Sequence, residues 1–153
     1  MKPLSLTAIV RHRNRKHEPM ILESALLCLA ANIYHEARGE LIPGQYAVAL
    51  VTLNRAGSPE KVCKTVMAKH QFSWTTKLVA REGKGFRLKA AGLPKDEHAW
   101  WLAKRIAQHT LNKGIGDLTN GSTHYHSTKV RPYWSKVLAK TKQIGRHIFY
   151  IGK

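Results

Sequence analysis

Acidic side chains are scarce in this sequence. Its 153 residues include 9 Asp and Glu against 26 Lys and Arg, which gives a formal net charge of +17 at pH 7. A positive field of this size attracts polyanions such as nucleic acids, anionic membrane surfaces and acidic cell-wall polymers. The shortage of carboxylates therefore predicts an anionic partner, and composition alone does not choose among these three.

Cysteines and long apolar runs are also few. Cys28 and Cys63 are the only two cysteines, which excludes a multi-bridge disulfide framework and a CxxC metal site. Both lie among apolar residues, so we expect buried thiols. No segment approaches the ~18 apolar residues of a membrane span. At the N-terminus a short apolar stretch precedes a basic run, the reverse of a secretory signal, and predicts a chain that starts in the cytoplasm.

Helical periodicity dominates the rest of the chain. Leu22, Leu26, Leu29 and Ile33 form one apolar stripe in a predicted helix over 21–38, which Gly39 ends. Further helices are expected at 43–55, 58–69 and 94–112, with a short one at 132–138. We expect residues 71–93 to be irregular or a short hairpin, 115–130 to be turn-rich and 144–151 to be a terminal strand. The pattern predicts one domain over 20–153, preceded by a weakly ordered basic arm over 1–19.

Glu36 is unusual among the nine carboxylates because it falls near the buried face of a helix. It lies fourteen residues after Leu22, so at ~100° per residue it is within about 40° of the apolar stripe. Burial raises the pKa of a glutamate, as a general acid at neutral pH requires, although the net positive charge opposes this. The structural alternative is a glutamate paired with Arg38 or Arg55, and position alone does not decide between the two.

Glu40 and two polar-aromatic segments are the other candidates. Glu40 lies just past Gly39, where it would orient Glu36, act as a second glycosidase carboxylate or, as we favour, anchor a loop. Aromatic rings beside amides and hydroxyls suit a glycan groove, although the same rings would also suit a core. The residues of these two segments are Gln71, Phe72, Ser73, Trp74, Thr123, His124, Tyr125 and His126.

The histidines raise the alternative of a zinc site. His124 and His126 alternate as on a strand, and His35 precedes Glu36. The HExxH pattern of zinc peptidases is absent, however, because Arg38 and Gly39 follow Ala37. We therefore expect no metal and no other cofactor, and we expect the histidine rings to line the substrate cleft or to form hydrogen bonds within it.

Several separated motifs together resemble the SleB/CwlJ-type cell-wall hydrolases. They run in order from about residue 21 to 151 and cover nearly the whole predicted domain. The matching blocks are Ile33–Glu40, Gly44–Gln45, Val51–Arg55 with Asn54, Gln71–Trp74, Asp117–His126 and Ile144–Tyr150. One departure is Leu118, where proline is expected in the family.

The resemblance implies an α+β, mostly α, lysozyme-like single domain with a small β region lining a substrate cleft. It implies that the protein cleaves the bond between N-acetylmuramic acid and N-acetylglucosamine in peptidoglycan, as a lytic transglycosylase or muramidase. Glu36 would be its catalytic acid. Such a lyase needs a single acid/base residue, because the substrate supplies the nucleophile.

The compact basic build resembles a bacteriophage endolysin, which is made in the host cytoplasm and reaches the wall at lysis. We expect a monomer whose net charge draws it to an anionic wall or outer-membrane surface. Two alternatives stay open. One is a zinc-dependent amidase or peptidase that cuts peptidoglycan stems. The other is a basic nucleic-acid-binding protein, against which the sequence lacks the motifs of helix-turn-helix, zinc and RNA-recognition modules.

Overall fold

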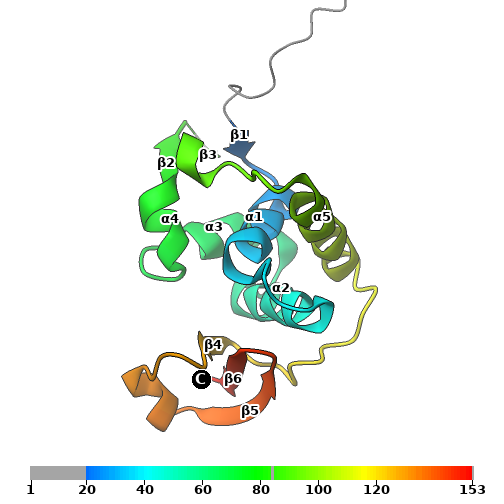
Figure 1. Cartoon of the computed structure of the whole chain (residues 1–153), viewed down its shortest axis with the longest axis vertical. Coiled ribbons are helices and arrows are strands. Elements are labelled where there is room, and N and C mark those ends of the chain that lie inside the picture. The colour runs from blue at the N-terminus through cyan, green and yellow to red at the C-terminus, as the bar shows by residue number, and fades with distance from the viewer. Residues whose placement is uncertain (1–19, 84, 153) are drawn as a thin grey trace, which may run out of the picture.

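The computed structural model describes residues 20–83 and 85–152 as a helical body with two small sheets (Figure 1). The predicted basic arm at 1–19 lies outside the described residues. The helices are α1 (Ala25–Ala37), α2 (Ile42–Ala56), α3 (Val62–Met67), α4 (Ser73–Leu78) and α5 (Glu97–Leu111), with 3-10 turns η2 (Pro59–Lys61), η3 (Ala90–Gly92) and η4 (Tyr133–Lys136). The predicted mostly helical α+β class is confirmed.

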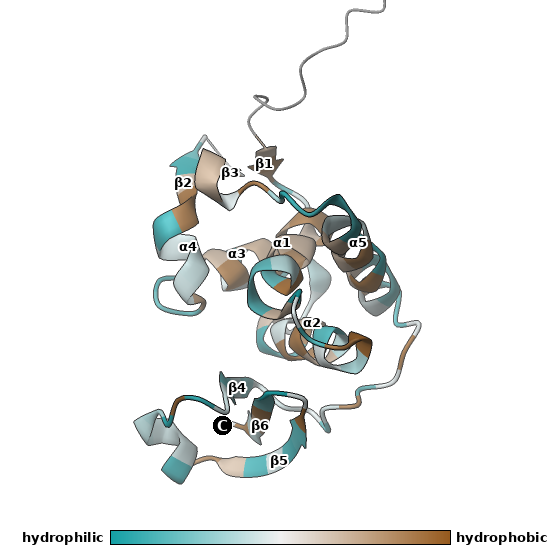
Figure 2. Cartoon of the chain, in the orientation of Figure 1, coloured by the Kyte–Doolittle hydropathy of each residue, from teal (hydrophilic) through white to brown (hydrophobic). Residues whose placement is uncertain are grey.

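Helix α1 is the centre of the body and packs against α2, α3 and α5 (Figure 1). It begins where the Ser24 side chain accepts a hydrogen bond from the Leu27 amide, 3.1 Å away. Residues 28–34 are all buried, so the helix is apolar on nearly every side. Helix α5 lies on the surface and carries both hydrophilic and hydrophobic residues (Figure 2). It turns Ala103, Ile106 and Ala107 inward.

Each sheet has three antiparallel strands. The first pairs β1 (Met20–Leu22), β3 (Gly85–Leu88) and β2 (Val79–Glu82) in that order, and the second pairs β4 (His124–Ser127), β6 (His147–Ile151) and β5 (Ala139–Ile144). The second sheet lies below α2 in Figure 1 and contributes Phe149 to a small core with Ala47 and Val51. This contact brings strand β4 to the end of α1 that carries Glu36.

Several predicted elements differ from the structure. Residues 20–22 pair with β3 as a strand instead of starting the first helix. Helix α4 was expected to be irregular, because its six residues are too few to show a period. Strand β5 was missed because its exposed basic residues lack an apolar alternation.

The prediction of two buried thiols was wrong. Cys28 in α1 and Cys63 in α3 form a disulfide, with Cα atoms 5.2 Å apart, although the two residues are 35 positions apart in sequence. Their spacing gave no signal, because the bond depends on how α1 and α3 cross. None of the helices within residues 20–83 and 85–152 has the length and hydrophobicity of a membrane-spanning segment.

Candidate active site

Glu36 lies in the last turn of α1 with its side chain half-buried. The hydroxyl of Tyr125, on strand β4, donates a hydrogen bond of 2.9 Å to Glu36 Oε2. The two residues are 89 positions apart, so the contact exists only because the second sheet packs beneath the helices. Arg38 turns away instead: its guanidinium donates to the Tyr34 carbonyl and stacks on the Tyr34 ring.

A small cavity of about 180 Å³ surrounds this carboxyl group. Its lining is polar and comes from four parts of the chain: Glu36, Arg55, Gln71, Phe72, Ser73 and Tyr125. Glu36 is the only carboxylate in this lining. Arg55 comes from α2, and its guanidinium sits 5.3 Å from the centre of the Phe72 ring. The cavity therefore combines one acid with one cation, one amide and two hydroxyls.

Burial sets the protonation of this group. It raises the pKa of Glu36 above its ordinary value, while the hydrogen bond from Tyr125 and the charge of Arg55 act in the opposite direction. The pKa of Tyr125 is also raised well above its ordinary value, first by burial and then by the Glu36 charge. Tyr125 thus stays a neutral donor, and Glu36 keeps its proton to higher pH than an exposed glutamate.

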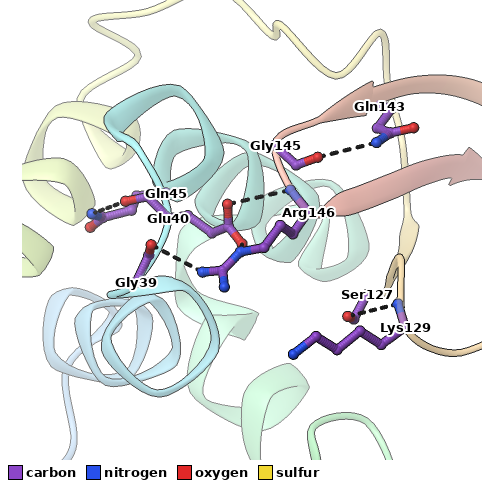
Figure 3. A network of polar contacts seen from close by, with 8 residues as sticks. All are labelled: Gly39, Glu40, Gln45, Ser127, Lys129, Gln143, Gly145 and Arg146. Atoms are coloured by element: carbon purple, nitrogen blue, oxygen red, sulfur yellow. Dashed lines mark hydrogen bonds and ion pairs between the residues drawn. The ribbon is translucent and has the colours of Figure 1, made fainter.

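Glu40 makes the contacts of a loop anchor (Figure 3). Its carboxylate accepts from Arg146 Nε at 3.1 Å and from the Arg146 amide at 3.4 Å. The same guanidinium donates to the Gly39 carbonyl at 3.1 Å, just past the end of α1. Gly145 has φ of +56°, and a Cβ there would lie 2.6 Å from Glu40 Oε2. Glu40 therefore ties the end of α1 to the β5–β6 turn, and its carboxylate is outside the cavity lining.

Asn54 acts on the loop that precedes β4. Its amide donates to Asp117 Oδ2 at 2.8 Å and to the Ser122 carbonyl at 3.0 Å. Asp117 also accepts from Thr119 and from the Gly121 amide. Burial alone would raise the pKa of Asp117, but these hydrogen bonds together lower it. Asn54 therefore shapes the approach to β4 from outside the cavity.

Trp74 is buried in the core and does not line the cavity, whereas Phe72, which is buried in the same core, and Ser73 both line it. Its indole N–H donates to Asn32 Oδ1 at 2.8 Å, and its ring stacks on His35 with centroids 4.5 Å apart. His35 Nε2 hydrogen-bonds with the Gly92 carbonyl. The polar residues around Phe72 and Trp74 in the sequence did not indicate which of these two rings lines the cavity.

The two histidines of β4 point to the other face of their sheet from Tyr125, because side chains alternate along a strand. Neither histidine is among the residues that line the cavity at Glu36. His126 stacks on Tyr150 and hydrogen-bonds with its hydroxyl, and both histidine rings pack against Trp134. Thr123 hydrogen-bonds with His124 Nδ1 at 2.9 Å. Residues 20–83 and 85–152 contain no group of three His, Cys, Asp or Glu side chains placed to hold a metal ion.

Two basic residues of this region, Arg55 and Arg146, were not predicted as site residues from the sequence. Arg55 was considered only as a structural partner, although the VTLNR block contains it. Arg146 lies inside the matching block near the C-terminus but has no pattern of its own. A basic residue in a chain with 26 Lys and Arg does not stand out.

Comparison with known proteins gives one family and two related structures. Residues 39–150 match the model of a family described as Cell Wall Hydrolase, so Glu36 lies three residues before the matched segment. The catalytic domain of the germination-specific lytic transglycosylase SleB from Bacillus anthracis aligns with a TM-score of 0.63 and 26% identity, over 84% of this chain and 95% of that one. The catalytic domain of Bacillus cereus SleB aligns with a TM-score of 0.58 and 28% identity, over 82% and 89%. No curated protein matches.

Proposed function

This chain belongs to the Cell Wall Hydrolase family, and from that premise we propose that it cleaves peptidoglycan glycan strands with Glu36 as the general acid/base. The observation that carries the proposal is the cavity at Glu36. It holds one carboxyl group with a raised pKa, a fixed hydrogen bond from Tyr125 and a nearby cation. The similarity to a lytic transglycosylase catalytic domain supports a lyase product.

One carboxyl group is enough for this reaction. Protonated Glu36 donates its proton to the glycosidic oxygen, and the bond from that oxygen to C1 of the muramic acid ring breaks. The Glu36 carboxylate then takes the proton of the C6 hydroxyl, whose oxygen attacks C1 and closes a 1,6-anhydro ring. No water is consumed, and Glu36 ends protonated as it began. Arg55 stabilises the carboxylate between the two steps.

Product analysis tests the reaction class. Purified sacculi are digested, and the soluble fragments are identified by mass spectrometry. We expect 1,6-anhydromuramic ends. New reducing muramic ends would show that the enzyme is a hydrolase and not a lyase. Free stem peptides would show that it is an amidase and does not cleave the glycan strand.

Glu36→Gln tests the residue. The amide keeps the shape but has no transferable proton, so we expect the rate to fall by ~10²–10⁴-fold. The control is Glu97→Gln, which changes an exposed acid in the first turn of α5. Glu36 is not the acid if its Gln variant retains a tenth of the wild-type rate.

We further propose that the protein acts as a bacteriophage endolysin, made in the host cytoplasm and recruited to the anionic envelope by its charge. The Cys28–Cys63 disulfide supports work in an oxidising compartment outside the inner membrane. Expressed in a bacterial cytoplasm, it should leave cells intact until the membrane is permeabilised and then lyse them. Lysis without permeabilisation would contradict this setting.

A further inference from the structure

A second and larger cavity, of about 780 Å³, lies between α3, α4 and the β2–β3 hairpin. Its lining includes the apolar side chains of Met67, Val79 and Phe86. None of its lining residues takes part in the cavity at Glu36. The mechanism described above leaves this space without a role.

The lining of this cavity also includes three cations. Lys64, Lys69 and Arg81 line it against a single carboxylate, Glu60. All three are exposed, and within the described part of the chain none of them forms a salt bridge. The Arg81 guanidinium sits 5.6 Å from the centre of the Phe86 ring, which holds it beside the apolar floor. The cavity thus suits a ligand that carries both carboxylates and small apolar groups.

The two cavities are neighbours across one short segment. Residues 71–73 line the cavity at Glu36, while Ala68, Lys69, Thr75 and Thr76 line the larger one. The segment 68–76 therefore contributes to both cavities, and a ligand attached to a sugar at Glu36 would follow this segment to reach the cations.

We propose that the larger cavity binds the acidic peptide stem that branches from the muramic acid ring of the substrate. The stem carries free carboxylates and methyl side groups, which match the three cations and the apolar floor. This inference rests on the proposed glycan cleavage and adds that the enzyme selects strands that carry stems. Contacts to the stem, remote from the reacting bond, would lower KM and leave kcat nearly unchanged.

The test compares two substrates and two charge-matched variants. The substrates are uncrosslinked glycan strands with stems and the same strands after their stems are removed. The cavity variant is Lys64→Glu with Lys69→Glu. The control is Lys77→Glu with Lys89→Glu, two exposed residues near the cavity but outside its lining. We expect the cavity variant to raise KM for stem-bearing strands about tenfold, from lost and reversed ion pairs. Its kcat/KM on stem-free strands should equal that of wild type.

Direct binding separates this proposal from the proposed function. A soluble stem tripeptide is titrated into the full chain by calorimetry, which needs no catalysis. Wild type and the control variant should bind it, and the cavity variant should lose binding, with Lys64→Gln and Lys69→Gln as the milder pair. No binding to wild type, or equal loss in the control variant, overturns the stem site. Stem binding without any glycan cleavage would instead overturn only the proposed reaction.

Discussion

At the scale of single residues, the proposed chemistry depends on how Tyr125 and Arg55 affect the charge of Glu36. Burial favours the protonated form of Glu36, whereas the Tyr125 hydroxyl and the Arg55 cation favour its carboxylate. A general acid/base needs both forms, because it gives up a proton in one step and recovers it in the next. Tyr125 and Arg55 therefore keep the pKa of Glu36 from rising as far as burial alone would raise it.

Tyr125→Phe removes the hydrogen bond that stabilises the Glu36 carboxylate. The pKa of Glu36 should then rise further, and Glu36 should stay protonated to higher pH. The limb of kcat/KM that falls as pH rises should therefore move to higher pH, while the loss of positioning lowers the maximum. The measurement is a pH profile of glycan cleavage. Tyr133→Phe is the control, because Tyr133 is 83% exposed. If the falling limb of the Tyr125→Phe profile moved to lower pH, Glu36 would not be the group that this limb reports.

At the scale of elements, the cavity at Glu36 depends on contacts that hold α1 against the second sheet. Arg146 in the β5–β6 turn contacts Glu40 and Gly39 at the end of α1. The Glu40 side chain is only 9% exposed, whereas that of Arg146 is 61% exposed. Removing the Arg146 side chain would leave a nearly buried carboxylate without its cation, which costs more than losing an exposed ion pair.

Arg146→Gln should lower the free energy of unfolding by about 1–3 kcal/mol. Glu40→Gln in the same chain should restore part of that loss, since the neutral amide needs no cation. Denaturant unfolding of the four chains of this double-mutant cycle measures the coupling. Arg131→Gln is the matched control at an exposed arginine. Additive losses from the two changes would show that Glu40 and Arg146 do not act together.

The disulfide holds the first half of α1 against α3. Its reduction should lower the free energy of unfolding by about 2–4 kcal/mol, because the unfolded chain regains the freedom of the closed loop. Thermal unfolding with and without a reductant measures this. The double variant Cys28→Ala with Cys63→Ala should melt at the same temperature in both buffers. A wild-type Tm that does not respond to the reductant would show that the bond adds no stability.

At the scale of the whole molecule, the positive charge is unevenly distributed. No Asp or Glu follows Asp117, so residues 118–153 carry seven Lys and Arg and no acid. Most of that segment forms the second sheet and its loops, on the side of the protein that supplies Tyr125. An anionic wall would therefore attract this face together with the proposed catalytic site.

Salt should weaken this attraction. The Debye length falls from about 10 Å at 0.1 M to roughly 3 Å at 1 M ionic strength. Binding to sacculi and the rate of lysis should therefore fall across this range, while cleavage of a short soluble glycan should change much less. Co-sedimentation and turbidity measure the two effects. Unchanged affinity for sacculi would show that the charge serves only solubility.

The sequence by itself determined the features that act within a few residues of each other. The apolar stripe predicted helix α1, and Gly39 predicted where this helix ends. The position of Glu36 relative to the stripe predicted that Glu36 is partly buried. Helices α2 and α5 and the terminal strand β6 also lie close to their predicted positions. These predictions succeed because backbone geometry repeats every 3.6 residues in a helix and every two in a strand.

Only the tertiary structure decided which distant groups meet. The partner of Glu36 is 89 residues away, that of Glu40 is 106 and that of Cys28 is 35. It also placed Phe72 in the wall of the cavity and Trp74 outside it, although both rings are buried in the core. It put His124 and His126 on the opposite face of their sheet from Tyr125. Periodicity says which face of an element is buried but not which element covers it. That choice depends on how helices and sheets pack together, and a single sequence has no local signal for it.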